Sequence, residues 1–191
     1  MEAEMGNPRG GKVQIQNVVV SVVTDQRIDL NAIVSKFPSV EYRPKVFPGL
    51  CFRLKSPKTA TLIFSTGRMV CTGAKSIRQA KEAVHIVRRR LKGEGIIAEV
   101  GAEITVQNIV ASAVLDRSVD LDRAVEVLDN IMYEPEQFPG AIYRMEEPKV
   151  VILIFSQGKL VITGAKREEE AAMAVERLYA ILQEEEVLYS P

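Results

Sequence analysis

The stretch "TATLIFSTGRMVCTGAK" at residues 59–75 decides the fold, because nearly the same text returns as "VVILIFSQGKLVITGAK" at residues 150–166. The two copies lie 91 residues apart, and at that offset residues 13–91 align with residues 104–182 without a gap. Two copies of this length are too few and too long for a solenoid. The repeat therefore predicts either one body with pseudo-two-fold symmetry or two like domains.

Each copy predicts the same order of elements. A β-rich segment opens each copy, at residues 13–23 and 104–114. A short helix follows, capped by Asp29 in the first copy and following Asp120 in the second. Next come one very short strand and three longer ones: 40–44, 50–55, 58–65 and 67–73, then 131–134, 141–146, 149–156 and 158–164. Each copy closes with a long amphipathic helix, the first of which is capped by Ser76.

These elements predict an α+β fold in which four helices cover one face of about ten antiparallel strands. The expected parts are a short tail (1–12), a first repeat (13–95), a linker (96–103), a second repeat (104–183) and an acidic tail (184–191). The apolar helix positions are expected to be buried: Leu30, Ile33, Val34 and Phe37; Ile77, Ala80, Val84, Val87 and Leu91; Leu121, Ala124, Val125 and Leu128; Ala171, Val175, Leu178 and Leu182.

Composition excludes several classes of protein. The chain has 191 residues with 25 Lys and Arg against 25 Asp and Glu, but residues 1–95 carry 17 basic and seven acidic side chains and the rest is correspondingly acidic. Such a charge dipole is typical of different partners at the two ends.

No apolar run would span a membrane, and residues 1–11 lack the apolar segment of a secretory signal, so we expect a cytoplasmic protein. Cys51 and Cys71 form no metal-ligand pattern, and no metal or cofactor is expected.

Both faces of the predicted strands are rich in apolar residues. In residues 59–65, Ala60, Leu62 and Phe64 share one face, while Thr61, Ile63 and Ser65 share the other. An antiparallel sheet with one wet face would alternate apolar with polar residues. The four helices can cover only one face, so the second is either an interaction surface or the buried centre of a sandwich between the two copies.

The second face carries polar groups at matching places in the two copies. Asn17 and Thr72 recur as Asn108 and Thr163, among the small residues Val19, Val70, Val110 and Val161. Paired hydrogen-bonding groups among small apolar residues suit a shallow groove with few acceptors, as in the DNA minor groove. Basic residues flank the strands and could reach phosphates: Arg53, Arg68 and Lys75, then Arg144, Lys159 and Lys166.

Four phenylalanines occupy matching places near the ends of strands. Phe64 and Phe155 end a strand before a turn, while Phe47 and Phe138 lie in "FPG" loops, where Pro and Gly oppose burial in a regular strand. Two symmetric pairs at the sheet ends are interpreted as apolar wedges, which kink DNA when they insert between base steps.

Four motifs carry a resemblance to a known family: "YRPKVFPG" and "SPKTATLIFSTGRMVCTGAK" in the first copy, and "YEPEQFPG" and "EPKVVILIFSQGKLVITGAK" in the second. The chain resembles the TATA-box binding protein family over nearly its whole length, from Val13 to Leu182. The resemblance implies a saddle whose concave sheet binds the minor groove of a TATA element. Phe47, Phe64, Phe138 and Phe155 would then intercalate. Asn17, Thr72, Asn108 and Thr163 would contact base edges, and Val19, Leu62, Val70, Val110, Leu153 and Val161 would fill the groove. The six basic residues named above would hold phosphates.

The resemblance also implies partners. The closely similar copies and the absence of a long N-terminal extension are typical of archaeal members, whose partners are transcription factor B and RNA polymerase, at the nucleoid. In "YEPEQFPG", Glu134 and Glu136 stand where the first copy has Arg43 and Lys45. We therefore expect this acidic loop to dock a basic surface of transcription factor B. Pairing of two free copies through their sheets is left open.

Other functions remain as alternatives. An enzyme is not expected, because His85 is the only histidine and no catalytic pair recurs. A sheet-type binder of single strands would need aromatic residues in mid-strand, where this chain has Val, Asn and Thr. A protein-only adaptor could use the same apolar face. Titration with duplex and single-stranded oligonucleotides would separate these functions.

Overall fold

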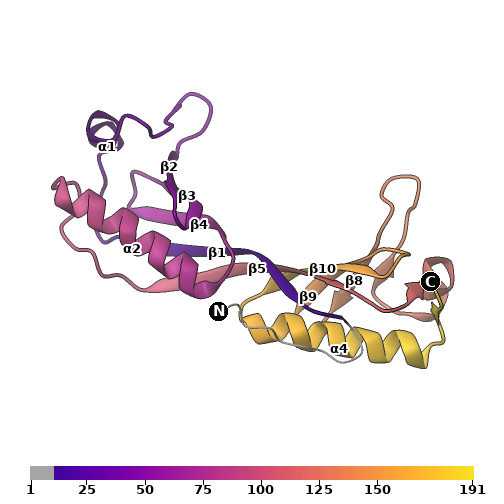
Figure 1. Ribbon diagram of the computed structural model, residues 1–191. Helices are drawn as coiled ribbons and strands as arrows, with labels where there is room; N and C mark the ends of the chain where they lie inside the picture. The colour runs from indigo at the N-terminus through magenta and orange to yellow at the C-terminus, as the bar shows by residue number, and fades with distance from the viewer. Residues whose placement is uncertain (1–10) are drawn as a thin grey trace. The chain divides into compact units, whose positions relative to one another are not determined.

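The computed structural model describes residues 11–191 and consists of two units (Figure 1). The repeat-1 unit is Asn17–Gln107, and the repeat-2 unit is Asn108–Pro191 together with residues 11–16. Most of the tail predicted at residues 1–12 lies outside the described residues. The unit boundaries therefore fall inside the first strand of each repeat.

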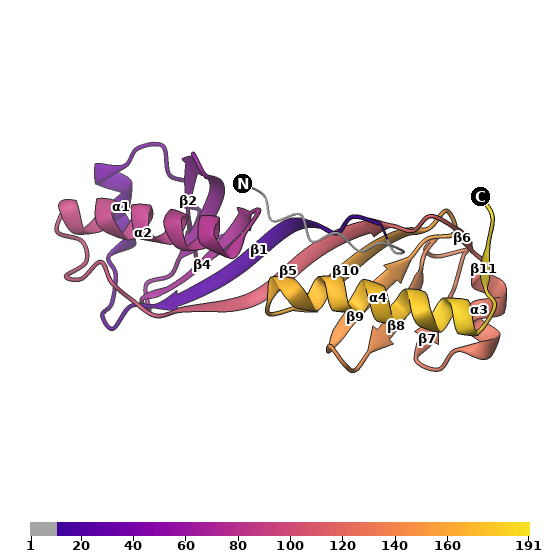
Figure 2. The ribbon, with the colours of Figure 1, turned by 60° about the horizontal axis from the view of Figure 1, so that its bottom comes forward.

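The repeat-1 unit is an antiparallel sheet backed by helices. Its strands lie in the order β2-β3-β4-β1. The elements are β1 (Gln14–Val23), α1 (Leu30–Lys36), β2 (Leu50–Lys55), β3 (Lys58–Ile63), β4 (Arg68–Ala74) and α2 (Ile77–Gly93). Helix α2 lies against the sheet and contacts β3 and β4 (Figures 1 and 2).

The repeat-2 unit repeats this plan and adds a small second sheet. Its main sheet has the order β5-β10-β9-β8-β7, and β11 pairs with β6. The elements are β5 (Ile104–Val114), β6 (Ser118–Val119), α3 (Leu121–Val127), β7 (Ile131–Met132), β8 (Ala141–Met145), β9 (Val150–Ile154), β10 (Lys159–Ala165), α4 (Glu168–Glu184) and β11 (Leu188–Tyr189). Helix α4 contacts β10, as α2 contacts β4.

The predicted α+β architecture with four helices is confirmed among the described residues, with one difference in the strands. The two main strand sets contain nine strands rather than ten. In the segment predicted at 40–44, only Glu41 pairs, with Cys51, because Pro44 follows closely and lacks a backbone donor. The pairing of β11 with β6, near the end of the chain, was not predicted because two-residue strands leave no periodic pattern.

The predicted helix caps at Asp29, Asp120 and Ser76 are confirmed. The Asp29 carboxylate accepts hydrogen bonds from the N–H groups of the first turn of α1, and Asp120 and Ser76 each accept one in α3 and α2. Helix α4 has no side-chain cap. Its first turn instead carries Glu168, Glu169 and Glu170, whose negative charges interact favourably with the positive end of the helix dipole and stabilise the helix.

The core lies between the helices and one face of each sheet. The long-helix prediction is confirmed at Ala80, Val84, Val87, Leu91, Ala171, Val175, Leu178 and Leu182, all buried, whereas Ile77 is only half-buried. The prediction was wrong for Val34 and Val125, which are each 39% exposed. A helix of seven residues presents only a narrow inward stripe, which Leu30 and Ile33 occupy in α1 and Leu121 and Ala124 occupy in α3. Phe37 and Leu128, just beyond these helices, are half-buried.

A buried arginine fixes the segment that follows α2. Arg88 is only 2% exposed, and its guanidinium donates to the Thr24 hydroxyl at 2.5 Å, the Val100 carbonyl at 2.7 Å and the Glu99 carbonyl at 3.0 Å. Gln26 also holds this segment, since its side-chain oxygen Oε1 accepts a hydrogen bond from Ala98 N at 2.8 Å. The end of the repeat-1 unit is therefore tied to the loop after β1.

Candidate nucleic-acid interface

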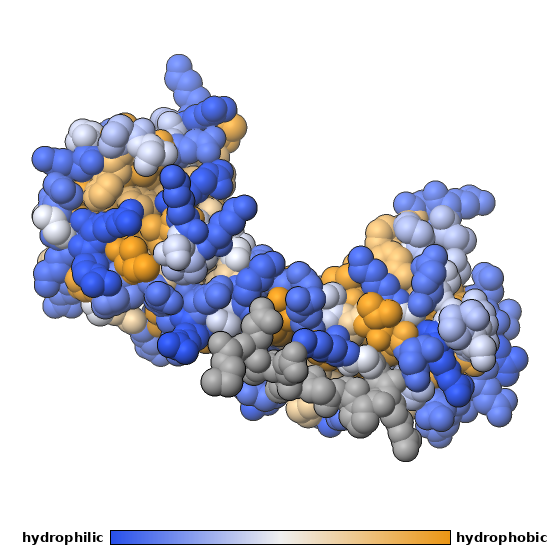
Figure 3. Space-filling view, in the orientation of Figure 1, coloured by the Kyte–Doolittle hydropathy of each residue, from blue (hydrophilic) through white to orange (hydrophobic). Residues whose placement is uncertain are grey.

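Each sheet has one covered face and one open face. In β1, Val18, Val20 and Val22 are almost completely buried, whereas Asn17 and Val19 are half-buried. We define the open face as the strand face turned away from the helices, and its half-buried residues are Asn17, Val19, Leu62, Val70 and Thr72 in repeat 1, and Asn108, Val110, Leu153, Val161 and Thr163 in repeat 2. These side chains therefore keep exposed surface, unlike the core residues of the covered face. Figure 3 shows hydrophobic surface on both units, bordered by hydrophilic residues.

The repeated "TGAK" motif forms a β-bulge in both repeats. Between β1 and β4 the register moves from Val20↔Cys71 to Val18↔Ala74, so β4 holds one extra residue. Gly73 lies in the bulge with φ of +100°, a backbone conformation that favours glycine. In repeat 2 the same shift between β5 and β10 contains Gly164, with φ of +98°.

The bulge turns a backbone N–H toward the asparagine of the neighbouring strand. Gly73 N donates to Asn17 Oδ1 at 2.7 Å, and Asn17 Nδ2 donates to Thr72 Oγ1 at 3.1 Å. In repeat 2, Gly164 N donates to Asn108 Oδ1 at 2.7 Å, and Asn108 Nδ2 donates to Thr163 Oγ1 at 3.1 Å. The two Asn-Thr-Gly clusters therefore have the same geometry.

This bonding fixes the chemistry that each cluster offers. A backbone N–H can only donate, so the atom that faces it must be the amide oxygen, and the amide nitrogen points the other way. The nitrogen carries two hydrogens and gives one to the threonine hydroxyl, which leaves the second to donate to a ligand. Each cluster thus presents a hydrogen-bond donor among the valine and leucine side chains of the open face.

Aromatic pairs lie at one end of the sheet in each unit. Phe47 and Phe64 meet edge to face with ring centroids 5.8 Å apart, and Phe138 and Phe155 do the same at the same separation. Phe47 is 44% exposed and Phe138 is 39% exposed. Both rings of the first pair lie against Gly49, where an added Cβ would come within 2.7 Å of Phe47 and 3.0 Å of Phe64.

The sequence-predicted basic residues are all exposed. Arg68 and Lys159 begin β4 and β10, and Lys75 and Lys166 follow those strands. Arg53 in β2 lies opposite Ala60, and Arg144 in β8 lies opposite Val151, so both arginines project on the open face. The structure thus brings the polar clusters, the aromatic pairs and these cations onto or beside the open face of each unit.

The two "FPG" loops have the same backbone hydrogen bonds but opposite charge. Phe47 N donates to the Arg43 carbonyl at 2.9 Å, and Phe138 N donates to the Glu134 carbonyl at 3.0 Å. Glu134 and Glu136 are exposed, as Arg43 and Lys45 are. The charge difference is therefore a surface property and does not reflect different folding of the loops.

Sequence reasoning missed a second set of polar pairs, one within each unit. Gln16 Nε2 donates to Ser112 Oγ at 2.8 Å, and Gln107 Nε2 donates to Ser21 Oγ at 2.7 Å. Gln16 and Gln107 are equivalent in the repeat, and so are Ser21 and Ser112, so the same polar pair recurs in both units. The recurrence of "QN" and of the later serine in both copies was the available signal.

The side chains whose pKa is shifted by their surroundings lie away from the open face. Burial raises the pKa of the Cys71 thiol, and burial, followed by the Asp129 charge, raises the pKa of the Tyr143 hydroxyl. Burial lowers the pKa of Arg88, against a raising effect of the Glu99 carboxylate. Within residues 11–191, no cluster of His, Cys, Asp and Glu is arranged to hold a metal ion, and no helix combines the length and apolarity of a membrane span.

Comparison with known proteins places these features in a family. The family model described as "Transcription factor TFIID (or TATA-binding protein, TBP)" matches residues 12–93 and 103–185. A TATA-box-binding protein of Pyrodictium occultum is 56% identical over 169 residues, which make up 88% of this chain and 85% of the relative. One of Sulfurisphaera tokodaii is 52% identical over 177 residues, 93% of this chain and 89% of the relative. The solved structure "Methanococcus jannaschii TBP" matches with a TM-score of 0.83 and 44% identity, over 90% of this chain and 98% of that chain.

Proposed function

The chain belongs to the TATA-binding protein family of transcription factors, which are not enzymes, and from this premise we propose that it binds the minor groove of an A·T-rich promoter element through its open face. The observation that carries the proposal is the matched pair of Asn-Thr-Gly clusters. Each offers an amide N–H from a side chain whose oxygen is already occupied.

Donors are what the minor groove of A·T pairs can accept. Its edge presents only the N3 atom of adenine and the O2 atom of thymine, both acceptors, whereas a G·C pair adds the guanine amino group, which is a donor. The amide N–H groups of Asn17 and Asn108 would donate hydrogen bonds to adenine N3 or thymine O2, and they would be repelled by the guanine amino group. Because A·T and T·A present the same acceptors, the clusters would separate A·T from G·C without strongly separating A·T from T·A.

The aromatic pairs would act at the two ends of the site. We propose that Phe47 with Phe64, and Phe138 with Phe155, insert between base steps and kink the duplex. Unstacking a step costs a few kcal/mol, which apolar insertion and the enlarged contact offset. The exposure of Phe47 and Phe138 supports this role, since their rings are accessible without unfolding of the loops.

The remaining open-face residues supply contact and charge. Val19, Leu62 and Val70, with their repeat-2 counterparts, would fill the groove floor. Arg53, Arg68 and Lys75, with Arg144, Lys159 and Lys166, would hold phosphates. Since the whole chain has zero formal net charge, attraction to DNA must come from these local cations, and affinity should fall with rising salt.

We further propose that the DNA complex recruits transcription factor B and RNA polymerase at the nucleoid. The acidic loop with Glu134 and Glu136 is the proposed docking surface for transcription factor B. Its exposure and its charge reversal relative to the repeat-1 loop support this assignment. Pairing of two free copies through their open faces would bury the same residues and would compete with DNA.

Titration of the protein with labelled oligonucleotides tests the proposal. A TATA duplex should bind far more tightly than a G·C-substituted duplex of the same length or either single strand. Equal affinity for single strands would favour the single-strand function. The absence of binding to any of these nucleic acids would leave the protein-only adaptor.

A further inference from the structure

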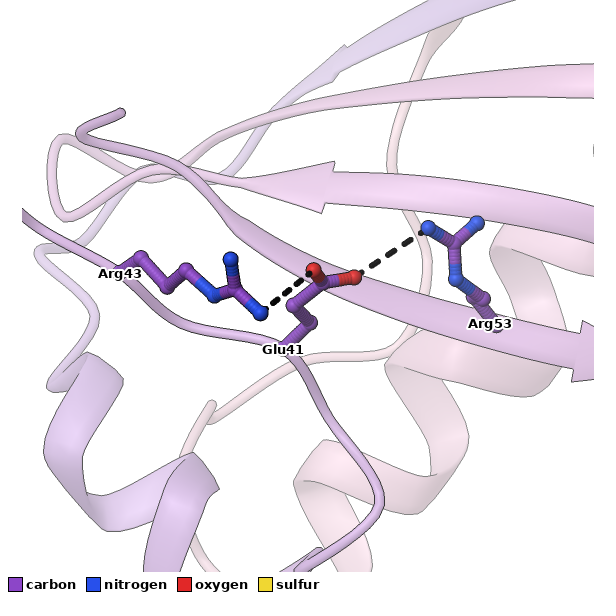
Figure 4. A network of polar contacts seen from close by, with 3 residues as sticks. All are labelled: Glu41, Arg43 and Arg53. Atoms are coloured by element: carbon purple, nitrogen blue, oxygen red, sulfur yellow. Dashed lines mark hydrogen bonds and ion pairs between the residues drawn. The ribbon is translucent and has the colours of Figure 1, made fainter. Parts of the chain in front are cut away.

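A charged network at the edge of the repeat-1 open face has no counterpart in repeat 2. The Glu41 carboxylate lies between two guanidinium groups, with Oε2 3.3 Å from Arg53 Nη2 and Oε1 3.9 Å from Arg43 Nη2 (Figure 4). One carboxylate therefore pairs with two cations. All three side chains are exposed.

The register places Glu41 on the open face. Glu41 pairs with Cys51 across an antiparallel bridge, and Cys51 in turn pairs with Leu62 of the open face. Directly paired residues project on the same face of a sheet. Glu41 is therefore on the same face as Arg53, for which a phosphate contact is proposed above.

Repeat 2 has different residues at the equivalent positions. Met132 replaces Glu41 and pairs with Ile142 in the same place, while Glu134 replaces Arg43 and Arg144 replaces Arg53. Met132 is 48% exposed, and its thioether cannot pair with a cation. Among residues 11–191, Arg144 forms no ion pair. Arg53 and Arg144 are thus equivalent in the repeat, but within the described part of the chain only Arg53 is paired with a carboxylate.

We propose that Glu41 is a specificity-determining residue that competes with a DNA phosphate for Arg53. This inference rests on the proposed DNA binding. When the open face meets DNA, Arg53 must exchange the carboxylate for a phosphate, and the released Glu41 is left facing the anionic backbone. Arg144 makes its contact without such an exchange. The two repeats would therefore hold the two ends of a site with unequal strength, although their arginines are equivalent.

The expected effect is small but measurable. An exposed ion pair alters an equilibrium by roughly two- to five-fold, and this is the range for the gain in DNA affinity when the Glu41 charge is removed. Each phosphate neutralised by protein steepens the dependence of log K on log salt by about 0.9. Freeing Arg53 should therefore steepen that slope by at most about one.

Paired variants test the inference by fluorescence anisotropy on a TATA duplex at several salt concentrations. Glu41→Gln removes the charge and keeps the shape, so it should bind more tightly and with a steeper slope. Met132→Glu introduces the carboxylate beside Arg144 and should bind more weakly with a shallower slope. Glu82→Gln, on the exposed side of α2, makes the same change in net charge away from the open face and is the control.

The outcomes separate this inference from the proposed function. If the parent protein does not bind the TATA duplex, both fail. If the parent binds and Glu41→Gln changes affinity and slope no more than Glu82→Gln does, only the competition by Glu41 is overturned. Opposite shifts in Glu41→Gln and Met132→Glu, with thermal unfolding unchanged, support it.

Discussion

The substitutions Asn17→Asp and Asn108→Asp test the chemistry of the polar clusters with almost no change in shape. Aspartate keeps an oxygen where Oδ1 accepts from the glycine N–H at 2.7 Å. It replaces the amide nitrogen with a second oxygen, to which the threonine hydroxyl can donate by rotating. The internal bonds of the cluster therefore survive, while the group offered on the open face changes from a donor to a charged acceptor.

The expected loss of affinity follows from two contributions. One hydrogen bond to a base is lost, worth about 1 kcal/mol, and an acceptor is buried against the adenine or thymine acceptors, at a cost of about 1–3 kcal/mol. The total is about 2–4 kcal/mol for each substitution. About 1.4 kcal/mol corresponds to a ten-fold change in the dissociation constant. Each substitution should therefore weaken DNA binding by roughly 30-fold to several hundred-fold.

The assay is an equilibrium titration of a TATA duplex with parent and variants, alongside thermal unfolding of the free proteins. Asn31→Asp, at an exposed position of α1, makes the same chemical change away from the open face and should bind like the parent. If either cluster variant unfolded like the parent and kept its affinity within about three-fold, the donor role of the asparagines would be refuted.

Three further predictions concern other parts of the chain. Phe64→Ala and Phe155→Ala should each reduce DNA bending measured by fluorescence transfer, since the apolar wedge is shortened; an unchanged bend in both would remove the wedge role. Glu134→Arg combined with Glu136→Arg should leave DNA binding nearly intact but weaken the complex with transcription factor B in a gel shift, more so at low salt; normal assembly would exclude docking at this loop. Arg88→Met should lower the free energy of unfolding, measured by urea denaturation, by about 2–4 kcal/mol, because it removes three hydrogen bonds of the guanidinium, one of them to the buried Thr24 hydroxyl; a loss well under 1 kcal/mol would contradict the anchoring role of Arg88.

The repeat, the helices and the longer strands could be predicted from the sequence because their signals are local. Asp29, Ser76 and the alternation in residues 59–65 each depend on neighbours a few positions away. The Asp29 cap and the alternation also recur in the second copy, which supports the element order more strongly than any single segment does. Even so, the short helices were predicted with too wide an apolar face, as Val34 and Val125 show.

The polar geometry of the candidate site could not be predicted, since it depends on partners distant in sequence. Asn17 is 56 residues from Gly73, and the bulge that joins them appears only when β1 and β4 are paired. The ion pair of Glu41 with Arg53 likewise requires the bridge to Cys51. The recurrence of Asn17, Gly73 and Arg53 was visible in the sequence, but their hydrogen-bond partners and the role of Glu41 were not.

The most direct test of the central claim is an affinity measurement on duplexes in which the central A·T pairs are replaced by inosine·cytosine pairs. Such a pair lacks the guanine amino group, so its minor groove offers acceptors as an A·T pair does, while its major groove matches G·C. If the open face reads the minor groove through amide donors, the inosine duplex should bind nearly as tightly as the TATA duplex, and the G·C duplex much more weakly. Affinity for the inosine duplex as low as that for the G·C duplex would contradict minor-groove recognition.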